Sequence, residues 1–344
     1  MRTYRRRERY PITKENEIAT FMGELEYYRN NNQNPVMLLG HRIVNIYRNI
    51  NVQMVVSKKC NFSCPFCIEN DRKADSNDFL ETSGFPETVF DTVLCQYSDH
   101  GITPHVSITG GEPTLFPEKL KKIYAIAIKK WQLPFVNINT NGANPEILKE
   151  LESIWINLSR HHYCDTKANT IFGKKSEYTV GSMTTMQCVM MKGYIDSVSE
   201  IKKYMDFFTL LGADGFSFRG MSTLDVGKEY VDEINFSNAH AVDFFSIVEE
   251  VSNDPAFEFV QQKIGDHYWF EHYNYKGKPV RFTYSNFDFL RKVETEERKN
   301  NQWFSRATII SPTGRVYAGW TYDINELRFP SHPPLDNGQT SGII

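Results

Sequence analysis

The feature that most constrains the fold is an alternation of strand-like and helix-like segments between residues 52 and 220. Runs rich in Val, Ile and Phe predict six strands, at 52–57, 105–110, 135–140, 154–159, 185–191 and 214–220. Amphipathic patterns predict helices between them, at 86–100, 117–131, 144–153 and 197–212. Strands that alternate with helices form βα units and a parallel sheet, and six units are fewer than a closed (β/α)8 barrel needs. We therefore expect an α/β fold with a partial (β/α)6 TIM-like barrel.

The pattern changes beyond Gly220. One more helix is predicted at 236–253, and strands are predicted in PVRFTYS (279–285) and in a hairpin within RATIISPTGRVYAGW (306–320). These elements indicate a small C-terminal α+β hairpin extension. The expected divisions are an N-terminal segment packed on the core (1–50), the core (51–222), the extension (223–328) and a tail (329–344).

Composition narrows the functional class. The chain has 344 residues, of which 40% are hydrophobic and 24% charged, as in globular proteins. A net charge of −3 argues against nucleic acid as a partner. No run of apolar residues is long enough to span a membrane, and no apolar signal segment follows the charged N-terminus. We expect a cytoplasmic protein, a setting in which grouped cysteines bind metals or do chemistry more often than they cross-link.

Three of the six cysteines, Cys60, Cys64 and Cys67, lie within eight residues directly after the strand at 52–57. Ligand sites in parallel α/β folds form at the carboxyl ends of the strands. Three thiolates can hold three irons of a [4Fe–4S] cluster and leave one iron open, whereas a closed cluster needs a fourth cysteine. The alternatives are an incomplete zinc site and a chance grouping. No histidine lies at ligand spacing in this loop and no second CxxC is present, which disfavours zinc.

Three motifs resemble those of the radical S-adenosylmethionine (SAM) superfamily. The loop CNFSCPFC is similar to its CxxxCxxC signature, ITGGEPTLFP (108–117) to its GGE stretch, and NINTNG (137–142) to its third-strand TNG. The nearest subgroup by eye contains the molybdopterin-precursor cyclase and the SPASM and twitch enzymes. The resemblance covers residues 50–220.

The resemblance implies a radical SAM enzyme whose cofactors are a [4Fe–4S] cluster and SAM. Cys60, Cys64 and Cys67 would hold the cluster, and the amino and carboxylate groups of SAM would bind its open iron. Two glycines suit a close approach of backbone to a ligand, and a carboxylate suits an ammonium group. The residues implied to contact SAM are Phe66, Gly110, Gly111, Glu112, Thr140, Asn141, Ser159 and Arg160.

Each of these side chains also has a plainer interpretation. GGEP and TNG are ordinary turn sequences. Arg160 can be a surface cation and Ser159 a helix cap. His161 and His162 suggest acid–base groups, but a histidine pair after a strand is more often packed or solvated.

The chemistry that the resemblance implies starts with one electron from a flavodoxin or ferredoxin-type donor. Reductive cleavage of SAM then gives methionine and a 5′-deoxyadenosyl radical, which abstracts hydrogen from the substrate. The protein would orient the cofactor and exclude water, a task that suits a barrel lined by apolar side chains. No peptide-docking winged helix is recognisable at the N-terminus, which favours a small-molecule substrate. The alternatives are a ribosomally made peptide as substrate, and a non-catalytic Fe–S protein that binds or senses.

The chain departs from SPASM and twitch enzymes near its C-terminus, because no cysteine follows Cys188. ISPTGRVYAGW resembles the first hairpin of such domains, with Trp320 where a cysteine is expected, so we expect no auxiliary cluster. The aromatic residues of HYWFEHYNY (267–275) are expected to serve in core packing. Alternatively they form the floor of a substrate pocket, and one of three arginines binds an anionic group. The candidates are Arg219, Arg281 and Arg306.

Overall fold

The computed structural model describes residues 8–30, 35–67, 86–181, 183–221, 231–320 and 322–329. The expected tail lies outside these ranges except for Phe329. No helix in the described part of the chain is both long and apolar enough to cross a membrane.

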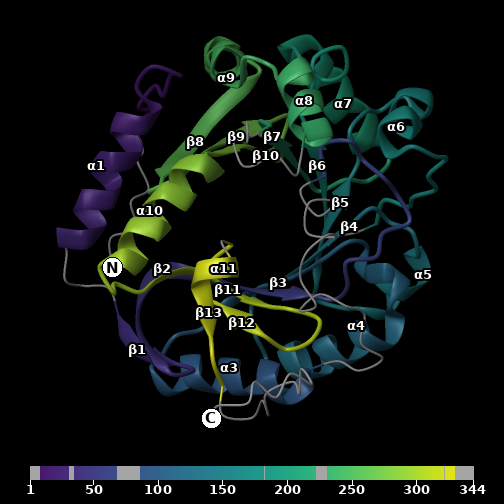
Figure 1. The fold of residues 1–344 in the computed structure, drawn as a ribbon. Helices are drawn as coiled ribbons and strands as arrows, with labels where there is room; N and C mark the ends of the chain where they lie inside the picture. Colours follow the sequence, from purple (N-terminus) through teal and green to yellow (C-terminus); the bar gives the residue numbers. More distant parts are fainter. Residues whose placement is uncertain are drawn as a thin grey trace, which may run out of the picture.

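The six predicted strands are confirmed, and they lie side by side in parallel. They are β2 Arg42–Val55, β3 His105–Thr109, β4 Val136–Thr140, β5 Trp155–Ser159, β6 Thr184–Val189 and β7 Gly215–Arg219. Strand β2 starts at Arg42, ten residues before the predicted start, and so crosses the expected boundary between residues 50 and 51. The partial parallel barrel expected from the alternation is therefore present (Figure 1).

The C-terminal strands extend this sheet on both sides. Strand β10 Lys278–Ser285 pairs in parallel with β7, and β11 Phe304–Ile310 pairs in parallel with β2. Backbone groups at the edges of a six-stranded sheet would otherwise lack partners, and these two strands supply them. Beyond β10 lie β9 Tyr268–Tyr275 and β8 Phe257–Ile264, and beyond β11 lie β12 Val316–Tyr317 and β13 Glu326–Leu327. The sheet of the described residues stays open between β8 and β13.

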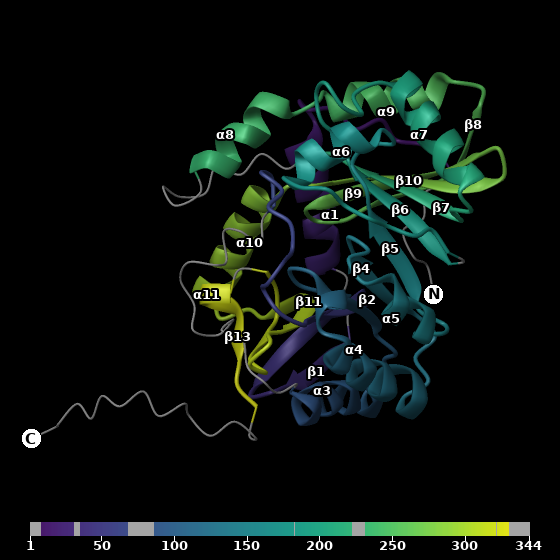
Figure 2. The same ribbon diagram turned by 90° about the vertical axis from the view of Figure 1, so that its right-hand side faces the viewer.

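Helices cover the outside of the strands, as Figures 1 and 2 show. The four predicted inter-strand helices are present as α3 Glu87–Asp99, α4 Pro117–Tyr124, α5 Pro145–Glu150 and α7 Val198–Leu210. Two others, α6 Asp165–Phe172 and α9 Phe244–Asn253, lie on the same face. Most of the hydrophobic core lies between these helices and the sheet, in two large clusters, one of which includes Phe216 and the other Val106.

Two helix predictions differ from the structure. The segment expected as one helix to residue 131 changes after Tyr124 into a π-helical turn, Ala125–Lys130, after which the Trp131 indole N–H donates to Asp91 at 2.8 Å. The single helix expected at 236–253 is wrong. Helix α8 Val231–His240 ends there, and Asp243 caps α9 by accepting from the Ser246 N–H at 3.1 Å.

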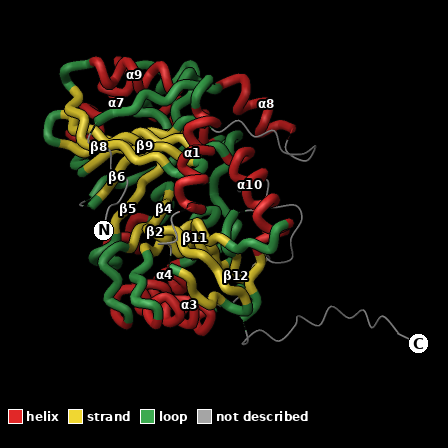
Figure 3. Tube along the Cα trace, turned by 90° about the vertical axis from the view of Figure 1, so that its left-hand side faces the viewer, coloured by secondary structure: helices red, strands yellow, loops and turns green. Residues whose placement is uncertain are grey.

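The N-terminal segment closes the open side of the barrel. Helix α1 Glu17–Asn30 packs against α10 Phe287–Lys299, with the rings of Phe21 and Phe289 6.1 Å apart. Helix α10 connects β10 to β11, and Figures 1 and 3 show it next to α1 between β8 and β11. Strand β1 Val36–Leu39 pairs antiparallel with the start of β2. A helix pair therefore fills the gap that the sheet leaves.

Candidate active site

The cysteine loop follows β2 and is held against helix α6. All six cysteines of the chain are thiols rather than disulfides, and Cys60, Cys64 and Cys67 are half-buried. The Cys60 Sγ accepts a hydrogen bond from the Phe62 N–H at 3.3 Å, and the Phe62 ring stacks on Phe172 of α6 at 4.5 Å. The loop is thus anchored by an aromatic stack while its thiols stay partly accessible.

The two glycines after β3 let their loop pack against the cysteine loop. A Cβ added at Gly110 would lie 2.3 Å from the Ser57 carbonyl oxygen, and one at Gly111 would lie 2.3 Å from that of Lys59. The Gly111 N–H donates to the Ser57 carbonyl at 2.7 Å, and the Glu112 N–H to the Lys59 carbonyl at 2.8 Å. The close approach expected at these glycines is therefore to the chain's own backbone.

Glu112 is buried, and its carboxylate connects two loops by hydrogen bonds. Its side chain is 1% exposed, and its carboxylate accepts from the Thr114 N–H and hydroxyl, the Thr140 hydroxyl and the Asn141 N–H, at 2.6–2.9 Å. Burial is the largest influence on the carboxyl and raises its pKa, while the hydrogen bonds oppose that rise. The carboxylate thereby fixes the turn after β4 to the turn after β3.

Asn141 carries this connection on to the cysteine loop. Its Nδ2 donates to Asn61 Oδ1 at 2.8 Å and lies 3.7 Å from Cys60 Sγ, while its Oδ1 accepts from the Ala143 N–H at 3.0 Å. The motifs GGE and TNG form turns, as expected if they are ordinary turn sequences. Hydrogen bonds join these two turns to each other and to the loop that carries Cys60.

The structure places Arg160 inside the protein, so the interpretation as a surface cation is wrong. Its side chain is 1% exposed and lies 4.2 Å from the Tyr178 ring. It forms an ion pair with Asp165 at 2.6 Å and donates to the Ser176 hydroxyl. Ser159 is half-buried at the end of β5, and it caps no helix because β5 runs straight into Arg160.

Phe66 and the two histidines pack rather than face open space. Phe66 lies against a cluster that includes Met191, and its ring meets His161 edge-on at 5.0 Å. His161 Nδ1 accepts from the Val189 N–H, and burial, helped by the Arg160 charge, lowers the pKa of His161 to about 3. His162 Nδ1 accepts from the Cys164 N–H. Both histidines are therefore consistent with the packing interpretation.

The donor set of the cysteine loop suits a cubane. In the described ranges, no three His, Cys, Asp or Glu side chains converge on a point that could hold a single metal ion. The thiolates of a [4Fe–4S] cluster each bind a different iron, so they need not converge in that way. Three accessible thiols on one anchored loop, with N–H groups directed at the first sulfur, fit such a cluster.

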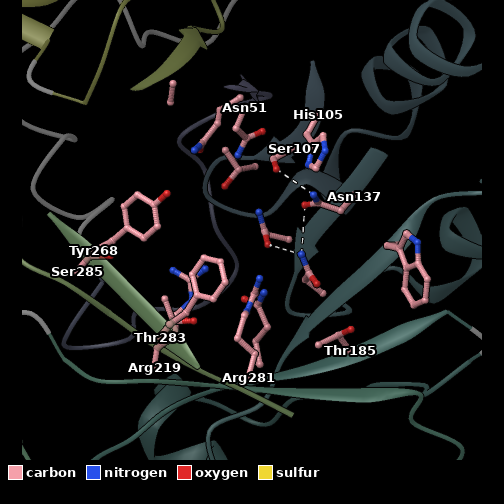
Figure 4. A pocket seen from close by; sticks show the side chains of 18 of the residues that line it. Asn51, His105, Ser107, Asn137, Thr185, Arg219, Tyr268, Arg281, Thr283 and Ser285 are labelled. Atoms are coloured by element: carbon pink, nitrogen blue, oxygen red, sulfur yellow. Dashed lines mark hydrogen bonds between the residues drawn. The ribbon is translucent and has the colours of Figure 1, made fainter. Parts of the chain in front are cut away.

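A large open cavity of about 820 Å³ occupies the inside of the barrel (Figure 4). Of the expected SAM-contacting residues only Gly110 lines it. The lining is mixed and not purely apolar as expected, because many side chains that point inward from the parallel strands are amides and hydroxyls, while Phe135, Trp155 and Phe270 add apolar surface. Six of these polar residues are Asn51, Gln53, Asn137, Asn139, Asn157 and Gln187.

The strand sequences contain a signal for this polar lining. Asn137 and Asn139 alternate with the buried Val136 and Ile138, so the asparagines share the opposite face of β4. Asn157 Nδ2 donates to Asn137 and Asn139 at 3.2 and 3.0 Å. Sequence reasoning missed this ladder because it considered the apolar residues of each run and not the amides that alternate with them.

The aromatic-rich segment forms β9, and aromatic side chains lie on both faces of that strand. Trp269 and Tyr273 lie in the core, while Tyr268, Phe270 and His272 line the cavity on the other face. Among the three candidate arginines, Arg306 is paired with Asp266 and with Glu297 at 2.8 Å. The other two, Arg219 and Arg281, face the cavity.

Comparisons with known proteins found one family model and several solved structures that are similar to this chain. A family model described as the radical SAM superfamily matches residues 54–187. No curated protein matched the sequence. The solved structures that resemble the chain include Streptococcus suis SuiB bound to precursor peptide SuiA. The identity is 15%, the TM-score is 0.46, and 88% of this chain and 63% of SuiB are covered.

Two further structures are similar. One is a histidine-tagged anSMEcpe with bound AdoMet, at 12% identity and a TM-score of 0.47, with 81% of this chain and 74% of that chain covered. The other is a radical SAM methyltransferase from Sphaerobacter thermophilus, at 14% identity and a TM-score of 0.39, with 57% and 66% covered. This chain spans less than two thirds of the two SuiB chains, 63% and 60% of their length. Residues 54–187 are therefore similar to the radical SAM superfamily, a family of enzymes that use a [4Fe–4S] cluster and SAM as cofactors.

Proposed function

We propose that Cys60, Cys64 and Cys67 hold the cluster and that the enzyme abstracts hydrogen from a small molecule in the barrel cavity. When bound, the cluster supplies the electron that cleaves SAM to methionine and a 5′-deoxyadenosyl radical. The observation that carries the proposal is the unit of three accessible thiols, Asn141 and the buried Glu112 at the carboxyl ends of β2 to β4.

The residues proposed for SAM surround this unit at the ends of neighbouring strands. They are Phe66, Gly110, Gly111, Glu112, Thr140, Asn141, Ser159 and Arg160. Glu112 and Arg160 have buried charged groups, so we propose that these two residues support SAM binding indirectly, by holding the loops in place. The backbone of the two glycine-containing turns and the accessible side of the cysteine loop remain for contacts with SAM.

The cavity supports a small-molecule substrate. Its volume of about 820 Å³ lies within the usual range for small-ligand pockets, about 300–1,000 Å³. Gly110 lines the cavity and contacts Ser57, three residues before Cys60, which supports a substrate bound near the proposed cluster site. The described N-terminal residues form helix α1 and strand β1, which pack on the barrel.

We propose a flavodoxin or ferredoxin-type protein as the electron donor. Membership of the subgroup of the molybdopterin-precursor cyclase and SPASM and twitch enzymes stays a prediction.

Anaerobic reconstitution tests the proposal. We expect about four irons per chain and 5′-deoxyadenosine release when SAM and dithionite are added. Replacing Cys60, Cys64 or Cys67 by Ala should abolish both signals. Cys95→Ala, at an exposed thiol on α3, is the matched control and should keep both. Bound zinc, or a cluster that leaves SAM intact, would contradict the proposal and favour a non-catalytic role.

A further inference from the structure

Two arginines on adjacent strands face the barrel cavity, and neither forms an ion pair with a carboxylate of the described residues. Arg219 ends β7, and Arg281 lies on β10, which pairs with β7 so that Arg281 is opposite Ser217. Arg281 donates to the Ser217 hydroxyl at 3.3 and 3.4 Å, which is long for a hydrogen bond. The Arg219 guanidinium forms no hydrogen bond or ion pair with the residues that the structure describes. Figure 4 shows the two side chains next to each other.

This arrangement is unfavourable for the protein alone. Burial lowers the pKa of Arg219, and burial together with the charge of Arg219 lowers the pKa of Arg281 to about 10. Arg219 is exposed to the open cavity and Arg281 is half-buried, and two neighbouring guanidinium groups repel each other. Elsewhere the chain neutralises its enclosed arginines, since Arg160 pairs with Asp165 and Arg306 pairs with Glu297. An unneutralised pair therefore indicates that the missing anion comes from a ligand.

The rest of the lining is consistent with an anionic ligand. Among the described residues that line the cavity, Glu294 is the one acid, and it accepts from the Asn325 amide. Lys263 adds a further cation on β8. Across the cavity from the arginines, Ser107 and Asn137 are hydrogen-bonded to each other (Figure 4). These groups give one wall that attracts an anion and another that can hydrogen-bond the rest of a polar molecule.

We propose that Arg219 and Arg281 together bind an oxyanion group, carboxylate or phosphate, of the small-molecule substrate. The planar guanidinium groups can each offer two parallel N–H donors to such a group. Tyr268 and Phe270 of β9 line the same cavity and supply apolar surface for the remainder of the molecule. The inference rests on the proposed function in that it takes the cavity as the substrate site.

Anion binding to the protein without cluster or SAM tests this inference separately from radical chemistry. Inorganic phosphate and malonate are titrated in chloride-free buffer, with the fluorescence of Trp155 and Trp320, which line the cavity, as readout. We expect saturable binding of at least one of the two ions. Tighter binding of phosphate would indicate a phosphate group on the substrate, and tighter binding of malonate would indicate a carboxylate. Arg219→Gln and Arg281→Gln should each weaken binding at least tenfold. Arg291→Gln, on the exposed face of α10, is the matched control and should bind as the wild type does.

Thermal unfolding of the same variants checks that they fold. Because each glutamine variant removes one of two repelling charges, its melting temperature without anion should equal or exceed that of the wild type. Arg219→Lys and Arg281→Lys keep the charge and should keep part of the affinity. The inference is overturned if the wild type binds neither ion, if the Gln variants bind as tightly as the wild type, or if SAM competes with the ion. If anion binding follows the expectation while SAM is not cleaved, the proposed function fails and the anion site stands.

Discussion

Glu112 should be the residue on which the arrangement of the cofactor loops depends most. Its two carboxylate oxygens divide four donors between them. Oε1 accepts from the Thr114 N–H, the Thr114 hydroxyl and the Thr140 hydroxyl, and Oε2 accepts from the Asn141 N–H. Glu112→Gln keeps the size of the side chain but turns one of the two acceptors into a donor.

The cost follows from these contacts. In the better of its two orientations, the Gln amide oxygen still accepts from the two Thr114 donors and the Thr140 hydroxyl. The Gln NH2 group then faces the Asn141 N–H, so that two donors meet and that hydrogen bond is lost. Losing a buried hydrogen bond to a charged group costs about 1.5–3 kcal/mol. Burial raises the pKa of Glu112, so part of that cost is offset because the neutral amide needs less solvation. We therefore expect Glu112→Gln to destabilise the protein by about 1.5 kcal/mol, the lower end of that range. Glu112→Ala leaves two buried backbone N–H groups without acceptors and should cost about 2–6 kcal/mol.

Urea unfolding of the apoprotein, followed by circular dichroism under anaerobic conditions, measures this cost. Glu118→Gln is the matched control, since Glu118 lies on α4 with its side chain 83% exposed and should change stability by less than about 0.5 kcal/mol. If the two Gln variants unfold at the same urea concentration with the same slope, Glu112 does not brace the loops and the reasoning fails.

Three further predictions concern single positions. Gly111→Ala sets a Cβ 2.3 Å from the Lys59 carbonyl oxygen, so we expect a loss of about 3 kcal/mol or more and poor expression, and a normally stable variant would contradict the contact. Gly23→Ala lies in α1 with nothing within 4 Å of the new Cβ, so it should raise the free energy of unfolding by about 0.5–1 kcal/mol; a decrease would refute this. His161 has a pKa of about 3 in the folded protein, below its ordinary value, so the unfolded chain binds the extra proton first as pH falls. Wild-type stability should therefore fall between pH 6 and 4 by up to about 1.4 kcal/mol per pH unit from this group, and His161→Gln should show a shallower slope. Equal slopes would contradict the assignment.

Much of the barrel could be predicted from the sequence because its strands are short apolar runs set between amphipathic helices. Segments such as 52–57 and 135–140 are buried on at least one face whatever their neighbours are, so local pattern suffices. The sequence of β9 predicts aromatic packing but no strand, and nothing in it predicts that β10 and β11 pair with β7 and β2. Such pairing depends on which sheet edges remain open after the core has formed, and that is not a local property.

The position of the candidate site was predictable for a similar reason. Loops that follow parallel strands meet at one end of a sheet, and the contacts of Asn141 with the cysteine loop confirm that they do so here. The orientation of side chains was not predictable. Glu112 turns inward because its acceptors meet donors on β4, and Arg160 is enclosed by Tyr178 and Ser176. These partners lie 16 to 28 residues away along the chain, beyond the range of local pattern.

Three cysteine sulfurs on a [4Fe–4S] cluster would leave one iron open for SAM. Electron–nuclear double resonance on the reduced, reconstituted protein tests it directly, with SAM that carries 17O in its carboxylate and 15N in its amino group. We expect both labels to couple to the cluster in the wild type and in Cys95→Ala. A reduced cluster with no coupling to either nucleus, or with a protein side chain on its fourth iron, would contradict it.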